Sequence, residues 1–168
     1  MIMDPSREIF FDFGRLKIPV RIPGHAEVLA MGRAETLSDP VGALLRALRE
    51  PIGGPPLTRF IEGKLAEKPD ATAVVVISDD TRPVPYSGEG GILYPLVEAM
   101  IESGLAAGNI RLLVATGTHH AMSEESLRAF LDPRLFSLGT PIRNHDCRDA
   151  NELVCIGRTE IGGDIYIN

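Results

Sequence analysis

Two apolar stretches rich in β-branched residues, separated by one helical pattern, constrain the fold of this chain most strongly. The first, ATAVVVIS, covers residues 71–78, and the second, IRLLVATG, covers residues 110–117. Both are apolar at successive positions, which is typical of strands covered on both faces in a parallel sheet. Residues 92–103 carry a broad apolar helical face, and a further helix is expected after Ser123 as its N-cap. This order predicts an α/β fold with a Rossmann-like parallel sheet built from βαβ units.

Weaker patterns precede this core. Two short β-type runs, residues 9–13 and 16–22, are separated by a glycine and predict a small N-terminal β-hairpin. A helix is expected to begin at Ser38 or Asp39 as its N-cap, and residues 57–66 form a second, weaker helix candidate.

The remaining part of the chain predicts further short strands and a particular organisation. We expect one α/β domain over residues 1–168, with the hairpin and helices in 1–70, the βαβα core in 71–131 and short strands in 140–168. The last residues, DIYIN, stop in the middle of a strand pattern. This ending suggests the N-terminal portion of a longer protein.

Charge and composition exclude several classes of partner. The 168 residues carry a net charge of −6, so a nucleic-acid backbone or an anionic membrane would repel the chain. The start, MIMDPSREIF, lacks the pattern of a signal peptide, and no apolar run approaches the roughly 18 residues of a membrane span. We therefore expect a cytoplasmic protein that binds neither nucleic acid nor membrane.

Polar side chains follow both predicted core strands at the points where the strands end. SDDTRP follows the first strand and ATGTHH follows the second. Ligands of open α/β sheets bind outside the carboxyl ends of the strands. A single βαβ unit therefore brings Asp79 and Arg82 to the same rim as Thr116, Thr118 and His119.

These residue types suit the binding of a small anion. The proline after Arg82 holds it extended, so its guanidinium is aimed and can bind a carboxylate or phosphate through two parallel hydrogen bonds. Gly117 can take positive φ, which would let the backbone amides of Thr116 to Thr118 form an anion nest. His119 is a natural acid or base at neutral pH. Asp79 could orient Arg82 or bind a ligand hydroxyl.

Purely structural interpretations of the same residues stay open. Asp79 and Asp80 could cap a turn, with Arg82 as their internal ion-pair partner. His119 and His120 could be solvated loop residues. Because adjacent side chains diverge in extended backbone, we do not expect these two histidines to hold a metal together.

The cysteines point to no metal or disulfide framework. Cys147 and Cys155 match no zinc-binding pattern, so reduced thiols are expected. His145 and Cys147 would share a strand face and could ligate a soft metal, but ordinary packing is the preferred interpretation. We assign no metal-binding residue in this chain.

Two segments together carry a resemblance to a known family. DDTRPVP at residues 79–85, combined with ATGTHHAMSEESL at residues 115–127, resembles the N-terminal half of the lactate racemase family. The resemblance runs the length of the chain, through its GGDIYIN ending. Members of this family use a nickel-pincer nucleotide to racemise or epimerise 2-hydroxyacids.

The resemblance implies roles for three residues. His119 looks like one of two histidines that remove the proton of the substrate hydroxyl while the α-hydride moves to the pincer ring. Arg82 looks like the group that holds the substrate carboxylate, and Asp79 matches an acidic residue near the cofactor and substrate. The family usually has arginine where this chain has His120, so the substrate could differ accordingly.

The resemblance also implies that part of the catalytic machinery lies elsewhere. The family's second catalytic histidine, its pincer-bound lysine and its nickel-ligating histidine all lie in segments beyond GGDIYIN. The first hypothesis is an N-terminal racemase domain, inactive and without cofactor on its own, whose partners are a small 2-hydroxyacid and the C-terminal half of the same protein. The alternative is a non-catalytic module that binds a small carboxylate, phosphate or mononucleotide.

Overall fold

The computed structural model of the chain describes residues 6–29, 31–32 and 34–167. Internal contacts divide the chain into two compact units, Met1–Thr36 and Leu37–Asn168. The expectation of one domain over the whole chain stays a prediction.

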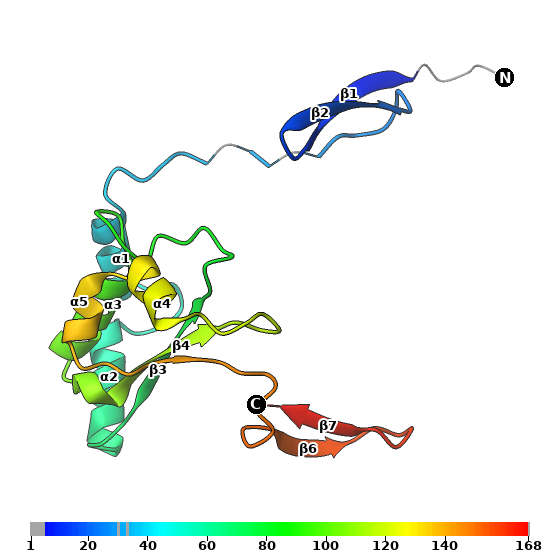
Figure 1. Cartoon of the computed structure of the whole chain (residues 1–168). Coiled ribbons are helices and arrows are strands. Elements are labelled where there is room, and N and C mark those ends of the chain that lie inside the picture. The colour runs from blue at the N-terminus through cyan, green and yellow to red at the C-terminus, as the bar shows by residue number, and fades with distance from the viewer. Residues whose placement is uncertain (1–5, 30, 33, 168) are drawn as a thin grey trace. The chain divides into compact units, whose positions relative to one another are not determined.

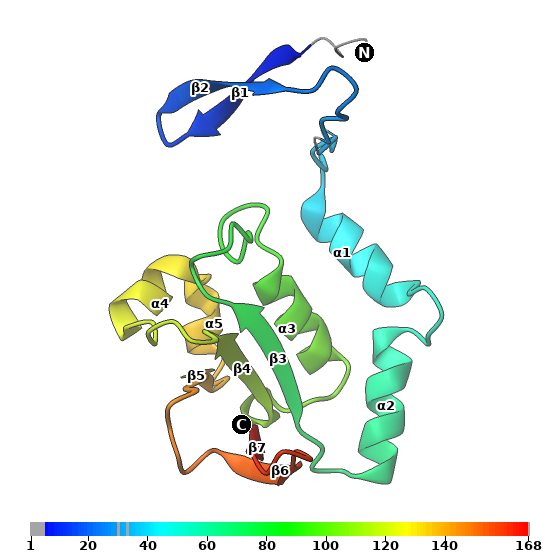
Figure 2. The ribbon, with the colours of Figure 1, turned by 90° about the vertical axis from the view of Figure 1, so that its right-hand side faces the viewer.

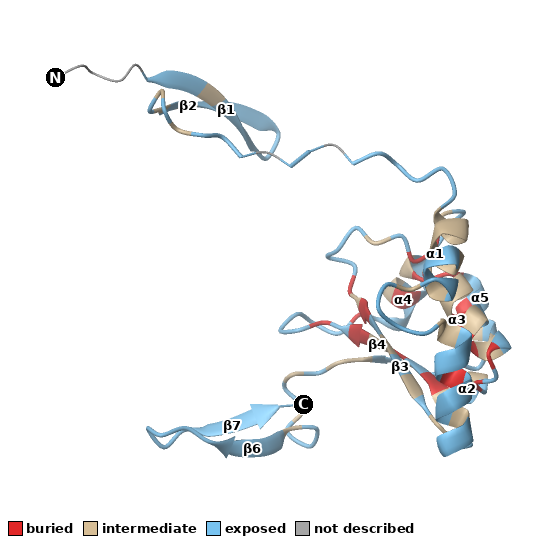
Figure 3. Cartoon of the chain, turned by 180° about the vertical axis from the view of Figure 1, so that it is seen from behind, coloured by how far each residue is buried: buried red, intermediate tan, exposed pale blue. Residues whose placement is uncertain are grey.

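The first unit contains the predicted N-terminal hairpin (Figure 1). β1 (Arg7–Phe13) and β2 (Leu16–Ile22) pair antiparallel along their whole length. Gly14 occupies the turn with a φ of 60°, a conformation that glycine adopts without a steric penalty. The hairpin is therefore confirmed, and most of its side chains are exposed (Figure 3).

The second unit is built on a three-stranded parallel sheet (Figure 2). β3 (Ala73–Ser78), β4 (Ile110–Ala115) and β5 (Ile142–Asn144) are hydrogen-bonded in the order β3-β4-β5. Helix α3 (Leu93–Glu102) connects β3 to β4, and a short 3-10 helix, η1 (Ala107–Asn109), leads into β4. The predicted α/β class and its βαβ unit are confirmed.

Helices gather on one side of this sheet (Figure 1). Besides α3 they are α1 (Pro40–Arg49), α2 (Leu57–Glu67), α4 (Glu124–Phe130) and α5 (Pro133–Ser137). Asp39 caps α1 by accepting a hydrogen bond from the Gly42 amide at 2.8 Å, and Ser123 caps α4 as predicted. α5 was not predicted from the sequence, although Asp132 as N-cap followed by Pro133 is a recognisable helix start.

The core lies between these helices and one face of the sheet. Parallel register pairs Val75 with Leu112 and Ile77 with Val114, so these side chains point to the same face. Leu112 and Val114 are fully buried. The helices contribute other buried apolar residues, including Val97 of α3.

The opposite face of the sheet corrects one prediction. The run of valines was expected to be covered on both faces, but Val74 is 56% exposed and Val76 is 62% exposed among the described residues. The run of β-branched residues reflects strand propensity, which does not by itself require burial on both sides.

A second antiparallel hairpin follows the sheet and confirms the predicted C-terminal strands. β6 (Val154–Arg158) pairs with β7 (Asp164–Ile167), and Gly162 has a φ of 88° in the connecting turn. Both strands are exposed along their length (Figure 3). None of the helices in the described part of the chain is both long and apolar enough to cross a bilayer.

Candidate functional site

The candidate site lies where β3, β4 and β5 end, because neighbouring parallel strands bring their carboxyl ends to one edge of the sheet. Asp79 follows β3, Thr116 follows β4 and His145 follows β5. Ser78 pairs with Ala115 at the end of the first two strands. Since β4 is the central strand, the loop after it lies between the segments that follow β3 and β5.

A short polar contact between two loops of this edge joins Asp79 to His119. The Asp79 Oδ2 and the His119 Nδ1 are 2.6 Å apart, although the two residues are separated by forty positions in the sequence. The Asp79 side chain is 6% exposed, whereas the His119 side chain is 52% exposed. A buried carboxylate therefore holds a histidine whose other side faces outward.

Hydrogen bonds to Asp79 keep it ionised. Its Oδ1 accepts bonds from the Thr81 hydroxyl at 2.5 Å and from the Thr81 amide at 3.2 Å. The Thr81 hydroxyl, followed by the bond to His119, lowers the pKa of the Asp79 carboxyl below its ordinary value. At neutral pH the carboxylate has no proton to donate, so the His119 Nδ1 must be the donor. The Nε2 of a neutral His119 is then free to accept a proton.

Arg82 differs from Asp79 in the same loop. Its backbone amide donates to the Asp79 carbonyl at 3.3 Å, which closes a turn. Its guanidinium is exposed and makes no hydrogen bond or ion pair with any described residue. The alternative in which Arg82 forms an internal ion pair with Asp79 or Asp80 is therefore wrong. Arg82 keeps all its side-chain donors available for a ligand.

Tyr86 closes the loop that carries Arg82. Its hydroxyl oxygen accepts a hydrogen bond from the Ser78 amide at 3.0 Å and lies 3.2 Å from the Ser78 hydroxyl. Its ring packs edge-on against Phe130 of α4, with the centroids 5.3 Å apart. The chain thus leaves β3 at Ser78 and returns to the same residue eight positions later.

The loop after β4 contains the predicted anion nest, residues Thr116 to Thr118. Gly117 has a φ of 58°, as expected. Thr116 is 2% exposed, donates its hydroxyl to the His145 carbonyl at 2.7 Å and uses its amide for the Val114 carbonyl. The amides of Gly117 and Thr118 donate to no described residue. Thr116 is thus an internal anchor, and only the next two amides are open to an anion.

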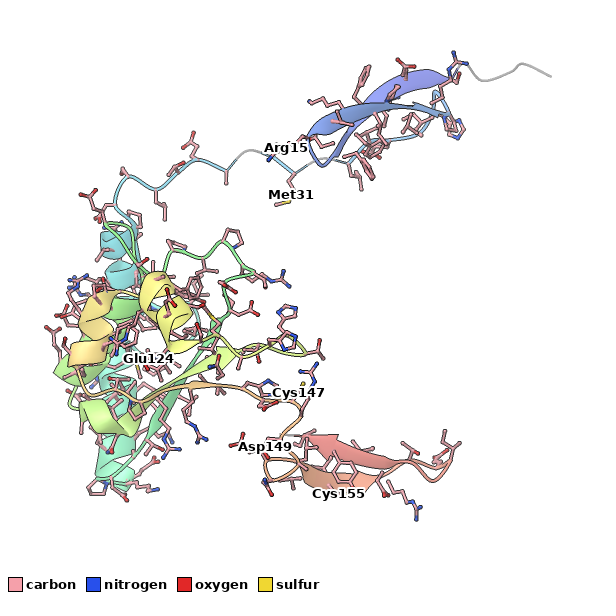
Figure 4. All side chains as sticks on the ribbon, in the orientation of Figure 1. Arg15, Met31, Glu124, Cys147, Asp149 and Cys155 are labelled. Carbon is pink, nitrogen blue, oxygen red and sulfur yellow. The ribbon has the colours of Figure 1, made fainter. Side chains whose placement is uncertain are left out.

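Two residues that the sequence analysis missed hold this loop from the side of β5. The Asn144 side chain accepts from the Met122 amide and donates to the Met122 carbonyl, both at 3.0 Å. Arg148 donates from Nη2 to the Thr118 carbonyl, also at 3.0 Å. Figure 4 labels Cys147 in the segment that carries Arg148. Neither residue lies in a motif, so only their places at the end of β5 and in the segment after it could have drawn attention to them.

The second histidine of the motif, His120, is exposed. Within residues 6–29, 31–32 and 34–167 there is no group of three or more histidine, cysteine, aspartate or glutamate residues arranged to hold a metal ion. Cys147 and Cys155 are both free thiols.

The site is an open rim rather than a deep cavity. Grooves of about 290 and 400 Å³ lie between α1 and α3 and are lined by residues such as Leu45, Arg49 and Ala99. Neither groove is lined by Asp79 or His119. These grooves are spaces between packed helices. The rim instead contains the hydrogen-bonded pair Asp79–His119 and the exposed Arg82, so the rim is the candidate site.

The fold and the rim together define an α/β domain with an aspartate–histidine pair and a free arginine at the carboxyl edge of a parallel sheet. The sequence profile of the lactate racemase N-terminal domain matches residues 13–168. The chain therefore belongs to the lactate racemase N-terminal domain family.

Individual relatives agree with this assignment. The chain is 32% identical over 123 residues to the lactate racemase of Thermoanaerobacterium thermosaccharolyticum and equally to that of Lactiplantibacillus plantarum. These alignments cover 73% of this chain and 26% of each relative, so the chain matches about a quarter of their length. The solved structure of the Thermoanaerobacterium lactate racemase apoprotein superposes with a TM-score of 0.62 at 27% identity, covering 96% of this chain and 36% of that one.

Proposed function

We propose that these residues form the N-terminal part of a 2-hydroxyacid racemase or epimerase and supply one of its proton-transferring groups. The observation that carries this proposal is the 2.6 Å contact between Asp79 and His119. Family membership narrows the chemistry, because the matched relatives are lactate racemases. A cytoplasmic location remains part of the proposal.

In the proposed reaction, His119 acts as the base for the substrate hydroxyl. Asp79 accepts the Nδ1 proton, which keeps the imidazole in the tautomer whose Nε2 takes the hydroxyl proton. As this proton leaves the oxygen, the C2–H bond breaks and its electron pair would pass as hydride to the acceptor that a bound cofactor supplies, which leaves a planar 2-keto acid. Hydride return to the opposite face inverts C2, and a protonated histidine restores the hydroxyl.

Arg82 is the proposed carboxylate-binding group. Its guanidinium has no described partner to give up, so binding a substrate carboxylate breaks no existing ion pair. The backbone bonds around it, from Arg82 to Asp79 and from Val84 to Arg82, restrict where it can point. The substrate is thereby oriented next to the histidine.

The residues present fit a nucleotide cofactor only in part. The open amides of Gly117 and Thr118 would hold an anionic group of a nickel-pincer nucleotide, while the described residues contain no cluster for nickel. When bound, this cofactor supplies the hydride acceptor. We therefore propose that cofactor attachment and metal binding depend on a C-terminal part of the same protein, and that the 168 residues alone are inactive.

The proposal is tested by paired histidine variants in the complete protein. His119→Ala should lower kcat for inversion of a 2-hydroxyacid by at least about 100-fold, because general base catalysis is lost. His120→Ala is the matched control, since His120 is also exposed but has no carboxylate partner in the described chain. Equal activity of wild type and His119→Ala would remove His119 from the chemistry.

A titration of the 168-residue chain distinguishes the alternative, a non-catalytic binding module. If the chain works by itself as such a module, acetate or phosphate should bind tightly and raise its melting temperature. The racemase proposal expects weak binding to the isolated chain, because only one side of the substrate is contacted. Tight binding together with inactivity of the complete protein would favour the module.

A further inference from the structure

Besides Asp79, three contacts from β5 or from the segment after it hold the loop that carries His119. The Thr116 hydroxyl bonds to the His145 carbonyl at the start of the loop, and the Asn144 amide group bonds to Met122 at the end. Arg148 holds the middle, through the Thr118 carbonyl. β5 therefore fixes the position of a loop that belongs to β4.

The middle contact differs from the two others. Thr116 is buried and Asn144 is partly buried, whereas Arg148 makes an exposed contact to the residue directly before His119. The loop between the two end anchors includes Gly117 at positive φ, the residue type with the greatest backbone freedom. Without Arg148, only the imidazole contact with Asp79 and one turn bond would hold the exposed tip.

Arg148 is itself placed by local structure. Its backbone amide donates to the Asp146 Oδ1 at 2.9 Å, which forms a turn just after β5. The turn places the start of the arginine side chain, so a long and exposed residue loses less freedom when it reaches the neighbouring loop. An arginine on a carbonyl makes a charge-assisted hydrogen bond, which is stronger than a neutral one.

We propose that Arg148 is a positioning residue for His119. It holds the backbone behind the histidine while Asp79 holds the imidazole in front, so that two contacts from two different strands determine where Nε2 lies. This inference rests on the proposed function, because His119 needs accurate placement only if it transfers a proton. Arg148 itself touches neither the substrate nor the reacting atoms.

The kinetic arm of the test uses the complete protein with Arg148→Met and Arg148→Lys. Arg148→Met should lower kcat by roughly 10- to 100-fold, since small misplacements of a reacting group have effects of this size. KM should stay within about twofold, because Arg82 still binds the carboxylate. Arg148→Lys should recover part of the loss, since an ammonium group also donates to a carbonyl.

The structural arm measures amide hydrogen exchange in the 168-residue chain. The His119 amide donates to the Thr116 carbonyl at 3.0 Å, and its exchange should accelerate roughly fivefold in Arg148→Met. Arg143→Met is the matched control, because that exposed arginine pairs with Glu152 at 3.4 Å and contacts no residue of the loop. The control should change neither exchange at His119 nor kcat.

The outcomes separate this inference from the proposed function. Faster exchange and lower kcat in Arg148→Met, with partial recovery by lysine, support it. Unchanged exchange overturns it, whether or not kcat falls, because the loop is then not held by Arg148. A rise in KM with unchanged kcat also overturns it, since Arg148 then binds substrate. If wild-type protein racemises nothing, the proposed function fails, and the exchange arm alone still decides whether Arg148 holds the loop.

Discussion

Two kinds of polar residue occupy the same rim, and they differ in burial and bonding. Asp79 and Thr116 are nearly inaccessible, and their side chains bond within the protein. Arg82 is exposed, and its side chain has no described partner. The difference follows from the cost of desolvation. A buried polar group without a hydrogen bond destabilises the fold, whereas an exposed polar group is hydrated and can bind a ligand. The first kind sets geometry, and the second is available for binding.

The largest expected effect is on catalysis and concerns Asp79, the buried residue that bonds to the exposed His119. Asp79→Asn should lower kcat of the complete protein by about 100- to 10,000-fold, because an amide can donate to Nδ1 and select the wrong imidazole tautomer. Steady-state kinetics would measure the loss, with circular dichroism as the check on folding. Unchanged kcat in a folded variant would show that the carboxylate does not serve the histidine.

The next effect concerns stability. Thr116→Val should reduce the free energy of unfolding by about 1–3 kcal/mol, because the partly buried hydrogen bond from the Thr116 hydroxyl to the His145 carbonyl is lost. The control Thr118→Val, in the exposed part of the same loop, should change it by less than about 0.5 kcal/mol. Urea unfolding measures both. Equal losses of unfolding free energy in the two variants would contradict the prediction that the buried Thr116 contributes more to stability than the exposed Thr118.

Arg134 and Arg82 compare a bonded arginine with one that has no described partner. Arg134 makes two bonds to the buried carboxylate of Asp132, at 3.0 and 2.7 Å, and lies over the ring of Tyr94. Arg134→Ala should lower the melting temperature by roughly 2–4 °C, the shift expected for about 1 kcal/mol in a chain of this size. Arg82→Ala should leave it unchanged while weakening carboxylate binding. A destabilised Arg82→Ala would reveal a structural role.

The smallest effect is a dependence of stability on pH. The pKa of Asp79 is lowered in the folded chain, chiefly by the Thr81 hydroxyl. Its contribution to stability is therefore complete above the unfolded pKa of about 3.9 and is lost as the pH falls through the lower folded value. Thr81→Val should raise the pKa of Asp79 and flatten the loss of stability as the pH falls below the unfolded value. Carboxyl NMR titration of Asp79 measures the shift directly.

The sequence was a good guide to strands, helices and the rim. Apolar runs ending in SDDTRP and ATGTHH predicted that the two loops meet at one edge, because strand order follows from the βαβ connection. Hydrogen-bonding partners were less accessible. Asp79 was considered a partner of Arg82, three residues away, whereas it bonds to His119 in the loop after the neighbouring strand. Such a pairing depends on register and side-chain rotamers, which periodicity does not encode.

Coverage of the sheet could not be predicted either. Val74 and Val76 belong to the same run of valines as the more buried Val75, and nothing in their residue type separates the two faces. Arg148 was missed for a related reason, since its contact with Thr118 joins positions thirty residues apart that share no motif. Local patterns predict elements, and contacts between loops require the assembled sheet.

The hydrogen bond from the Ser78 amide to the Tyr86 hydroxyl closes the loop that carries Arg82 into a ring, because both ends of the loop meet at Ser78. A ring of this kind is already ordered before any ligand arrives, so association need not remove much of its conformational entropy. A small acid offers few atoms for binding and cannot compensate for a large ordering cost. Preorganisation by one tyrosine hydroxyl would therefore favour the proposed binding of a small carboxylate by Arg82, which this loop carries.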